Sequence, residues 1–453
     1  MRRDEPKRRR ELRSGATISI AAAIALLALA AGALAATGDL GPKGCIDDKD
    51  TGPDTCFKTE DGLAGARAVA VSPDGSSVYV ASALDDAIVR FDRNTATGEL
   101  TPRGCVQDND TGTDDCAQSA DGLGLPFSIA VSPDGESVYA ASRGDDAVVH
   151  LDRNPNTGSL TPEGCVQDDD TGTDGCADSA DGLDDVNGVA VSPDGESVYA
   201  SSISDDAVVR FSRNLSSGNL TAKDCVEDND TGSGECAEST DGLDGAFSVA
   251  VTADGTTVYV AALDDSAIVH FRRNVSSGKL IPKDCLDDAA GPENCDDSTD
   301  GLSGAFGVAV SPDNKSVYAT AINSNAVVRF KRNTTNGVLI LRGCIQDDAG
   351  PGPCEESADG LNAPTSVTVS PDGESVYVGG TGDDAVVRFN RNTTSGALTP
   401  KGCVDDDFGL DNCAQTTDGL DGAAGVAVSP DGASLYAVSV VDEAIVRFAR
   451  DPG

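Results

Sequence analysis

A ten-residue stretch close to Val131–Ala140 (Val-Ser-Pro-Asp-Gly-Glu-Ser-Val-Tyr-Ala) occurs seven times in this chain. An apolar run, a Pro-Asp-Gly turn and a second apolar run predict strand, tight turn and strand, because proline presets φ and glycine accepts a positive φ. All seven tyrosines occupy the same place in the second strand. A repeat of this length, rich in short strands, is typical of a propeller or an array. The motif aspartates recur every 59 or 60 residues, at Asp74, Asp134, Asp194, Asp254, Asp313, Asp372 and Asp431.

Each repeat has room for four strands. In the second repeat we expect them at 128–132, 137–141, 147–152 and 159–166, separated by turns and loops. Four antiparallel strands that become more polar outward are what a propeller blade requires. The prediction is an all-β, seven-bladed β-propeller with four antiparallel strands per blade, formed by residues 37–453 as one domain.

The two ends of the repeat region predict how the ring closes. The last repeat stops after its third strand, at Ala444–Phe448. Residues Gly38–Cys45 match the fourth strand of other repeats, such as Gly98–Cys105. We therefore expect the N-terminal strand to complete the C-terminal blade, which pairs both edges that an open array would leave exposed. A linear solenoid, which would carry atypical capping repeats, is disfavoured.

Residues 1–36 differ from everything that follows them. Seven basic side chains lie within the first 13 residues, and residues 16–36 form an uncharged run rich in Ala, Leu and Ile. Ala33-Leu34-Ala35 fits a signal peptidase site, so we interpret residues 1–36 as a secretory signal peptide. An uncleaved N-terminal membrane anchor is the alternative, because the run is long enough to span a membrane. Either way, we expect the repeats to be extracellular or at the cell surface.

The chain carries a large excess of acidic residues. It has 76 Asp and Glu against 33 Lys and Arg, a formal net charge of −43. Such a surface repels nucleic acid and anionic membranes. We expect no nucleic-acid partner, membrane contact only through an N-terminal anchor, and a monomer that binds a protein, a glycan or a small molecule. The charge has two interpretations: solubility or salt adaptation, and attraction of cations or basic partners.

The 14 cysteines occur as two per repeat, with nine or ten residues between the members of a pair. An exported chain meets an oxidising compartment, where such pairs become disulfides. A zinc site needs four ligands close together, and the two histidines lie far from the pairs in sequence. Seven bridges within repeats are the simplest connectivity: Cys45–Cys56, Cys105–Cys116, Cys165–Cys176, Cys225–Cys236, Cys285–Cys295, Cys344–Cys354 and Cys403–Cys413.

The repeats share a longer signature, Ala-Val-Ser-Pro-Asp-Gly-x-Ser-Val-Tyr-Val followed by Asp-Asp-Ala-Val-Val-Arg-Phe and Thr-Gly-x-Leu-Thr. It resembles the YVTN-type and lactonase-like seven-bladed β-propellers over residues 38–453. The resemblance implies the fold and two function classes, since some relatives are lactonases acting on sugar lactones and many others look like surface or binding proteins. The long acidic cysteine loops and the near-identical blades favour an exported binding or scaffold module. The alternative is a lactonase-like hydrolase.

One position differs more between repeats than any other, at the entry to the innermost strand. We interpret its residues as the mouth of a shallow central pocket; packing beneath the loops is the alternative. His150 and His270 replace an arginine of other repeats, which favours polar packing over catalysis. The pocket candidates are Arg67, Phe127, Asn187, Phe247, Phe306, Thr365 and Ala424.

The cysteine loops of the first four repeats carry closely spaced acids and a glycine. Asp-x-Asp spacing lets two carboxylates converge on one ion, and calcium takes six to eight oxygen ligands. The pattern lacks the third acid and the twelfth-position Glu of an EF-hand loop. Calcium is therefore one interpretation, a solvated acidic loop is the other, and no second cofactor is expected. The candidate ligands are Asp48, Asp50, Asp108, Asp110, Asp168, Asp170, Asp228 and Asp230.

Overall fold

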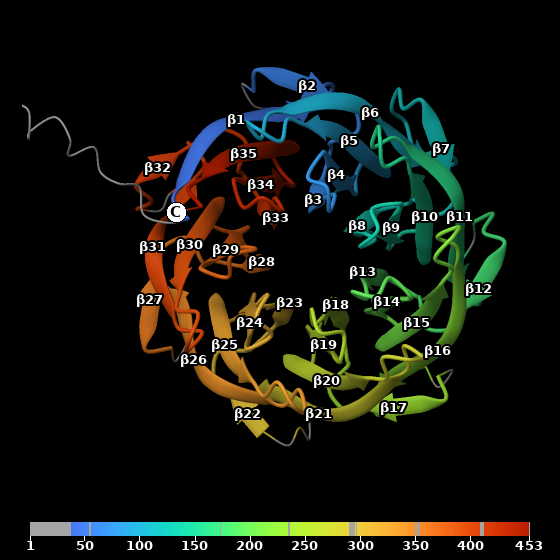
Figure 1. Cartoon of the computed structure of the whole chain (residues 1–453), viewed down its shortest axis with the longest axis vertical. Helices are drawn as coiled ribbons and strands as arrows, with labels where there is room; N and C mark the ends of the chain where they lie inside the picture. Colours follow the sequence, from blue (N-terminus) through green and yellow to red (C-terminus); the bar gives the residue numbers. More distant parts are fainter. Residues whose placement is uncertain are drawn as a thin grey trace, which may run out of the picture. The chain divides into compact units, whose positions relative to one another are not determined.

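The computed structural model describes residues 38–452 except 54–55, 173, 234–235, 290–294, 296, 349, 351–353 and 408–411. Within the compact unit Thr37–Gly453, seven β-sheets follow one another around a ring (Figure 1). The predicted all-β, seven-bladed propeller is confirmed. No helix long and apolar enough to cross a membrane occurs in the described part of the chain. The predicted signal peptide or anchor, residues 1–36, lies outside the described residues.

Five hydrogen-bonded strands make up each blade, and we number the blades in chain order from their innermost strands. Blade 1 contains β3 (Ala66–Val71), β4 (Ser77–Ser82), β5 (Ala87–Arg93), β6 (Leu100–Asp108) and β7 (Gln118–Ala120). Blade 2 contains β8 (Pro126–Val131), β9 (Ser137–Ser142), β10 (Ala147–Arg153), β11 (Leu160–Asp168) and β12 (Asp178–Ala180). Blade 3 contains β13 (Val186–Val191), β14 (Ser197–Ser202), β15 (Ala207–Arg213), β16 (Leu220–Asp228) and β17 (Glu238–Thr240). Blade 4 contains β18 (Ala246–Val251), β19 (Thr257–Ala262), β20 (Ala267–Arg273), β21 (Leu280–Asp288) and β22 (Asp297–Thr299).

The remaining three blades follow the same plan. Blade 5 contains β23 (Ala305–Val310), β24 (Ser316–Ala321), β25 (Ala326–Arg332), β26 (Leu339–Asp347) and β27 (Glu356–Ala358). Blade 6 contains β28 (Pro364–Val369), β29 (Ser375–Gly380), β30 (Ala385–Arg391), β31 (Leu398–Asp405) and β32 (Gln415–Thr416). Blade 7 contains β33 (Ala423–Val428), β34 (Ser434–Ser439), β35 (Ala444–Arg450), β1 (Leu40–Asp48) and β2 (Lys58–Glu60).

The prediction of four strands per blade is wrong by one short strand. In blade 2 the first four strands are antiparallel neighbours, as predicted. After the cysteine loop, β12 then pairs in parallel with β11, with Val166 opposite Asp178. The fifth strands have only two or three residues, most of them polar. They were missed because so short a segment shows no hydrophobic alternation.

The N-terminal strand closes the ring, as predicted. β1 pairs antiparallel with β35, with Leu40 opposite Arg450 and Asp47 opposite Ala444. Figure 1 shows β1, in blue, beside β35, in red. Both ends of the repeat region are therefore joined in one sheet, and neither leaves an unpaired edge.

The hydrophobic core lies between blades. Every residue of the second strand of each blade is buried. One core cluster combines Tyr79 and Ala81 of blade 1 with Val138, Ala140 and Leu151 of blade 2. Because each sheet is covered on both faces by its neighbours, its middle strands consist almost wholly of apolar and small residues.

An arginine at the end of each third strand joins neighbouring blades. In blade 2, Nε of Arg153 donates to the hydroxyl of Tyr79 (2.7 Å), and its Nη2 lies 3.1 Å from the carboxylate of Asp74. The Tyr79 hydroxyl donates in turn to the carbonyl of Gly158 (2.7 Å). Gly158 has a φ of +71°, and a Cβ atom there would lie 2.2 Å from Oγ of Ser77, so the position requires glycine. We call this Asp–Tyr–Arg group the inter-blade lock.

In the first of these locks, burial raises the pKa of Asp74, but hydrogen bonds from Ser72, Ser76 and Arg153 outweigh the effect of burial and bring that pKa down to about 2.

The inter-blade lock occurs at all seven interfaces, which explains why the sequence repeats its tyrosine and the aspartate of its turn. The other six locks pair Arg213 with Asp134 and Tyr139, Arg273 with Asp194 and Tyr199, Arg332 with Asp254 and Tyr259, Arg391 with Asp313 and Tyr318, Arg450 with Asp372 and Tyr377, and Arg93 with Asp431 and Tyr436.

Candidate functional site

The innermost strands surround a cavity of about 390 Å³ at the centre of the ring. Every blade contributes to its wall through its innermost strand, so residues about 60 positions apart in sequence face one space. All of the pocket candidates chosen from the sequence line this cavity: Arg67, Phe127, Asn187, Phe247, Phe306, Thr365 and Ala424.

Aromatic rings and Arg67 form part of the cavity wall, and Arg143 lies beside them. The guanidinium carbon of Arg67 lies 4.3 Å from the ring centroid of Phe127, and that of Arg143 lies 5.5 Å from it. Arg143 pairs with Asp185 at 2.8 Å, whereas Arg67 has no ion pair among the described residues. Burial and the nearby Arg143 lower the pKa of Arg67, but an arginine stays protonated in proteins. The cavity of this acidic protein therefore contains a positive charge.

Three buried polar atoms of the cavity residues have no hydrogen-bond partner among the described residues: Arg67 Nε, Asn187 Oδ1 and Ser366 Oγ. Asn187 is only 2% exposed, and its Nδ2 donates to the carbonyl of Asp185 at 2.7 Å, which fixes the amide group. A buried polar atom without a partner costs about 1–3 kcal/mol. These atoms are therefore places where a bound ligand would be stabilised.

Among the described residues, no carboxylate and no imidazole lines the cavity. A general base has to stand within hydrogen-bond reach of the proton that it removes. His150 and His270 lie elsewhere, on β10 and β20, where their rings stack on Tyr139 and Tyr259 at centroid distances of 5.2 and 5.6 Å. Both are 3% exposed, and burial lowers the pKa of His150. His270 also contacts the carboxylate of Asp284 through Nδ1, and neither histidine is among the described residues that line the cavity.

The first aspartate of each calcium-candidate pair binds the backbone. Oδ1 of Asp108 accepts the N–H groups of Asp110 and Thr111 at 2.8 and 2.9 Å, and Oδ2 accepts the N–H of Leu123 at 3.0 Å. The second aspartate of each pair is exposed, so the structure does not bring the two together as a buried pair. The same caps are made by Asp48, Asp168 and Asp228, and the exposed partners are Asp50, Asp110, Asp170 and Asp230.

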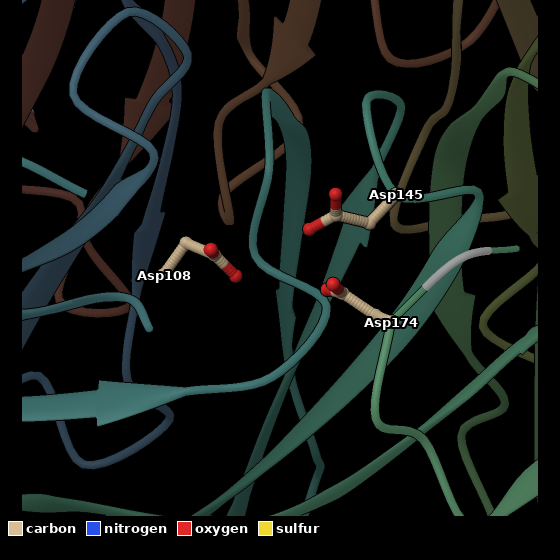
Figure 2. Close-up of side chains that lie close together, drawn as sticks. All are labelled: Asp108, Asp145 and Asp174. Carbon is tan, nitrogen blue, oxygen red and sulfur yellow. The ribbon is translucent and has the colours of Figure 1, made fainter. Parts of the chain in front are cut away.

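Carboxylates from two blades converge at a different place. Asp108 at the end of β6 lies with Asp145 of the β9–β10 loop and Asp174 of the blade 2 cysteine loop, with oxygens within 4.8 Å of one another (Figure 2). Burial and the negative charges of Asp174 and Asp108 raise the pKa of Asp145 to about 7. Three carboxylates match the oxygen ligands that calcium prefers. The sequence pattern did not predict that these three residues meet, because Asp145 and Asp174 belong to another repeat than Asp108.

Two adjacent aspartates, Asp145 and Asp146, follow the second strand of blade 2, and both accept backbone N–H groups. Asp145 accepts the N–H of Gly124 within its own blade, and Asp146 accepts the N–H of Asp185 in the next blade at 2.8 Å. A related acid group contains Asp146, Asp184 and Asp185. Asp145 and Asp146, which have counterparts at the same place in most repeats, thus have a structural role that the sequence alone does not reveal.

All seven predicted disulfides are present, each within one repeat, with Cα atoms 4.9–5.2 Å apart. Each bridge ties the fourth strand of a blade to the loop before the fifth strand. A complete set of bridges indicates an oxidising compartment.

The family described as "Lactonase, 7-bladed beta-propeller" matches residues 46–174. The chain is a seven-bladed β-propeller whose sequence resembles the lactonase family over these residues. No curated protein matches it. This lactonase-like propeller is similar to the periplasmic gluconolactonase of Pseudomonas aeruginosa, with 16% identity, a TM-score of 0.56, and 85% of this chain and 89% of that chain covered. A candidate 6-phosphogluconolactonase of Bacteroides uniformis has 18% identity and a TM-score of 0.53, with 77% and 85% covered.

The hydrazine synthase structure of Kuenenia stuttgartiensis has 17% identity to the lactonase-like propeller, a TM-score of 0.57, and 87% of this chain and 98% of that chain covered. Two of these solved structures carry lactonase names, and the third carries the name of a hydrazine synthase. At these identities the similarity extends to the fold alone, because propellers host many functions.

Proposed function

We propose that this lactonase-like propeller is an exported or cell-surface binding protein that takes a small, sugar-derived ligand in its central cavity. The observation that carries the proposal is the combination of three phenylalanine rings with three unpartnered buried polar atoms around one space. The seven disulfides and the signal-like residues 1–36 support export. We propose that it acts as a monomer without a nucleic-acid partner, in keeping with its negative charge.

The chemistry of the cavity favours a ligand with an apolar face and several oxygens. The rings of Phe127, Phe247 and Phe306 offer apolar surface to the C–H face of a sugar ring. Arg67 would donate to a carboxylate or carbonyl oxygen, and Oδ1 of Asn187 would accept a hydroxyl proton. A volume of about 390 Å³ lies at the lower end of the range for small-molecule sites.

A lactonase-like hydrolase is the second candidate, favoured by the family match over residues 46–174. In that reaction a water oxygen would bond to the lactone carbonyl carbon while a base takes one water proton. The ring ester C–O bond would then break, and that proton would pass to the leaving ring oxygen to give the hydroxy acid. The described cavity residues provide Arg67 to polarise the carbonyl but no carboxylate or imidazole to act as the base. Binding without turnover is therefore our first proposal.

Calorimetric titration of the purified protein with glucose, gluconate, glucuronate and glucono-1,5-lactone tests the proposal. We expect at least one of these ligands to bind, and Arg67→Gln and Phe127→Ala each to weaken its binding by about tenfold or more. The control is Arg103→Gln, which removes an exposed arginine of the outer strand β6 and should leave binding unchanged. No binding of any probe, or equal binding by Arg67→Gln, would overturn the proposal. Lactone opening above the spontaneous rate would instead support the hydrolase.

A further inference from the structure

Blade 5 carries a basic groove on a protein that is otherwise acidic. The groove encloses about 840 Å³ and is lined by polar and apolar residues, by Arg332, whose charge is paired with Asp254, and by Lys315, Arg329, Lys331 and Arg342. No Asp or Glu is among its described lining residues, although the chain has 76 acidic against 33 basic residues. A local reversal of charge on such a background marks a surface that attracts an anionic partner.

Three basic residues of this groove, Arg329, Lys331 and Arg342, lack acidic partners like those found in other blades, whereas Lys315 lies 3.8 Å from Asp313. Arg90 of blade 1 pairs with Asp92 at 2.7 Å, and the place of Asp92 is taken in blade 5 by Lys331. Arg210 of blade 3 pairs with Asp224 at 2.7 Å, and blade 5 has a glycine there. Arg329, Lys331 and Arg342 form no ion pair among the described residues. Their charge is available to a partner.

The neighbouring strand β26 has an edge that most blades block with proline. The third residue of the fourth strand is Ala222 in blade 3, Leu341 in blade 5 and proline in the other five blades. The N–H of Asn333 donates inward to the carbonyl of Val338 at 2.9 Å. Since strand residues alternate in direction, the N–H and C=O of Leu341 face outward. Proline at that place removes the outward donor and prevents pairing with another strand. The five prolines are Pro42, Pro102, Pro162, Pro282 and Pro400.

This edge is exposed and partly apolar. β27 pairs only with Ile345–Asp347, so Leu339–Cys344 have no strand on their outer side among the described residues. Ile340 is 43% exposed and Leu341 is 36% exposed. Ile340 and Arg342 line the basic groove. A second cavity of about 280 Å³ is lined by Leu341 and other apolar residues together with two arginines and three acids, Asp300, Glu355 and Glu356. A strand added here would therefore place its acidic side chains toward the basic groove and its apolar side chains toward the second cavity, where the excess of acids would repel acidic side chains.

We propose that β26 of blade 5 binds an extended, acidic peptide segment of another protein as an added β-strand. Backbone hydrogen bonds to Leu341 would hold the segment, and its alternate side chains would meet the basic groove on one face and apolar surface on the other. The apolar residues favour a peptide over an acidic polysaccharide, which has no apolar side chains to bury. The site is separate from the central cavity and does not depend on the function proposed for it.

The test is fluorescence anisotropy with the full-length protein and a labelled eight-residue peptide of alternating Glu and Val. Leu341→Pro introduces the residue that five other blades already have, and its matched control is Ala222→Pro on blade 3. Lys331→Asp introduces the residue found at Asp92, and its matched control is Arg272→Asp on blade 4. We expect Leu341→Pro and Lys331→Asp each to weaken binding by about tenfold, and both controls to bind as the parent protein does.

Three further probes decide between this site and its alternatives. These are a Lys-Val peptide, a Glu-Pro peptide that cannot pair as a strand, and an oligogalacturonate. Equal binding of the Lys-Val peptide would overturn the charge argument, and equal binding of the Glu-Pro peptide or the oligogalacturonate would overturn strand addition. Unchanged binding by Leu341→Pro, or no binding of the Glu-Val peptide, would also overturn the proposal. A thermal melt of each variant confirms that it is folded.

Discussion

At the scale of single residues, aspartates in this propeller have very different roles. Asp74 pairs with an arginine of the next blade, and its pKa falls to about 2. Asp108 caps the backbone of the cysteine loop. Asp145 lies against other carboxylates in a partly buried cluster, and its pKa rises to about 7. The surroundings, and not the residue type, decide whether an acid stabilises or strains the fold.

We predict that Asp145→Asn stabilises the protein at pH 8 in the presence of a chelator. The amide oxygen can still accept the N–H of Gly124, while the repulsion from Asp108 and Asp174 is removed. A rise of about 1–2 °C in melting temperature is expected. Asp110→Asn, at an exposed loop position, is the control and should change little.

Calcium is our proposed ligand for the cluster of Asp108, Asp145 and Asp174. In melts repeated with millimolar calcium, the ion should raise the melting temperature of the parent protein more than that of the Asp145→Asn variant. The reason is that the variant lacks one of the ligands. Magnesium controls for general charge screening. Equal shifts with calcium and magnesium would contradict the calcium proposal.

At the scale of elements, the blade is a unit of sequence but not of packing. Each core cluster takes residues from two blades, and each inter-blade lock joins them again at one rim of the ring. A single blade would therefore expose both of its apolar faces. The interfaces between neighbouring blades are therefore needed to cover the apolar faces, as neighbour interfaces are in other repeat proteins.

We predict that Tyr139→Phe destabilises the propeller by about 1–3 kcal/mol. Its hydroxyl accepts from Nε of Arg213 at 2.8 Å and donates to the carbonyl of Gly218. The phenylalanine ring would fill the same space but leave both buried partners unsatisfied. Urea unfolding of the two proteins measures the difference, and overlapping unfolding curves would show that the inter-blade lock adds nothing.

At the scale of the whole molecule, closure depends on segments from the two ends of the repeat region. β1 completes the sheet of blade 7, and Arg93 of blade 1 pairs with Asp431 of blade 7 at 2.8 Å. The carbonyl of Gly38 also accepts the hydroxyl of Tyr377 at 2.7 Å. The ring is thus closed by strand pairing within the sheet of blade 7 and by the inter-blade lock between blades 7 and 1.

Deletion of residues 38–44 should expose the edge of β35 and lower the melting temperature by several degrees. An unpaired edge also promotes association, so we expect dimers or larger species in sedimentation velocity. An unchanged melt with a single monomeric species would contradict this account of closure.

The free energy of unfolding of the propeller should be greatest near pH 4–5. Asp74 has a lowered pKa, so the stability it adds is present above its ordinary value of 3.8 and is lost as the pH falls toward 2. Asp85 and Asp145 have pKa values raised to about 7, so the stability linked to their protonated forms is complete below 3.8 and is lost as the pH rises through 7. Calorimetry in chelator from pH 2 to pH 9 checks this, and a maximum at pH 8 would contradict it.

The sequence by itself determined the propeller, its seven blades, its closure and its disulfides. The reason is that these features repeat, so each signal is present seven times and local patterns suffice to predict strands and turns. It also predicted which residues line the central cavity, because Arg67 and its six counterparts occupy one position in the repeat. A fixed place in a closed, symmetric ring is a fixed place in space.

Only the tertiary structure decided how neighbouring blades touch. Arg153 meets Asp74 and Tyr79 across a blade boundary, and Asp145 and Asp174 meet Asp108 across the same boundary. These contacts join different repeats, so no pattern within one repeat reveals them. The short fifth strands were missed for a related reason: β12 exists because it can pair with β11, and its own three residues carry no signal strong enough to predict it.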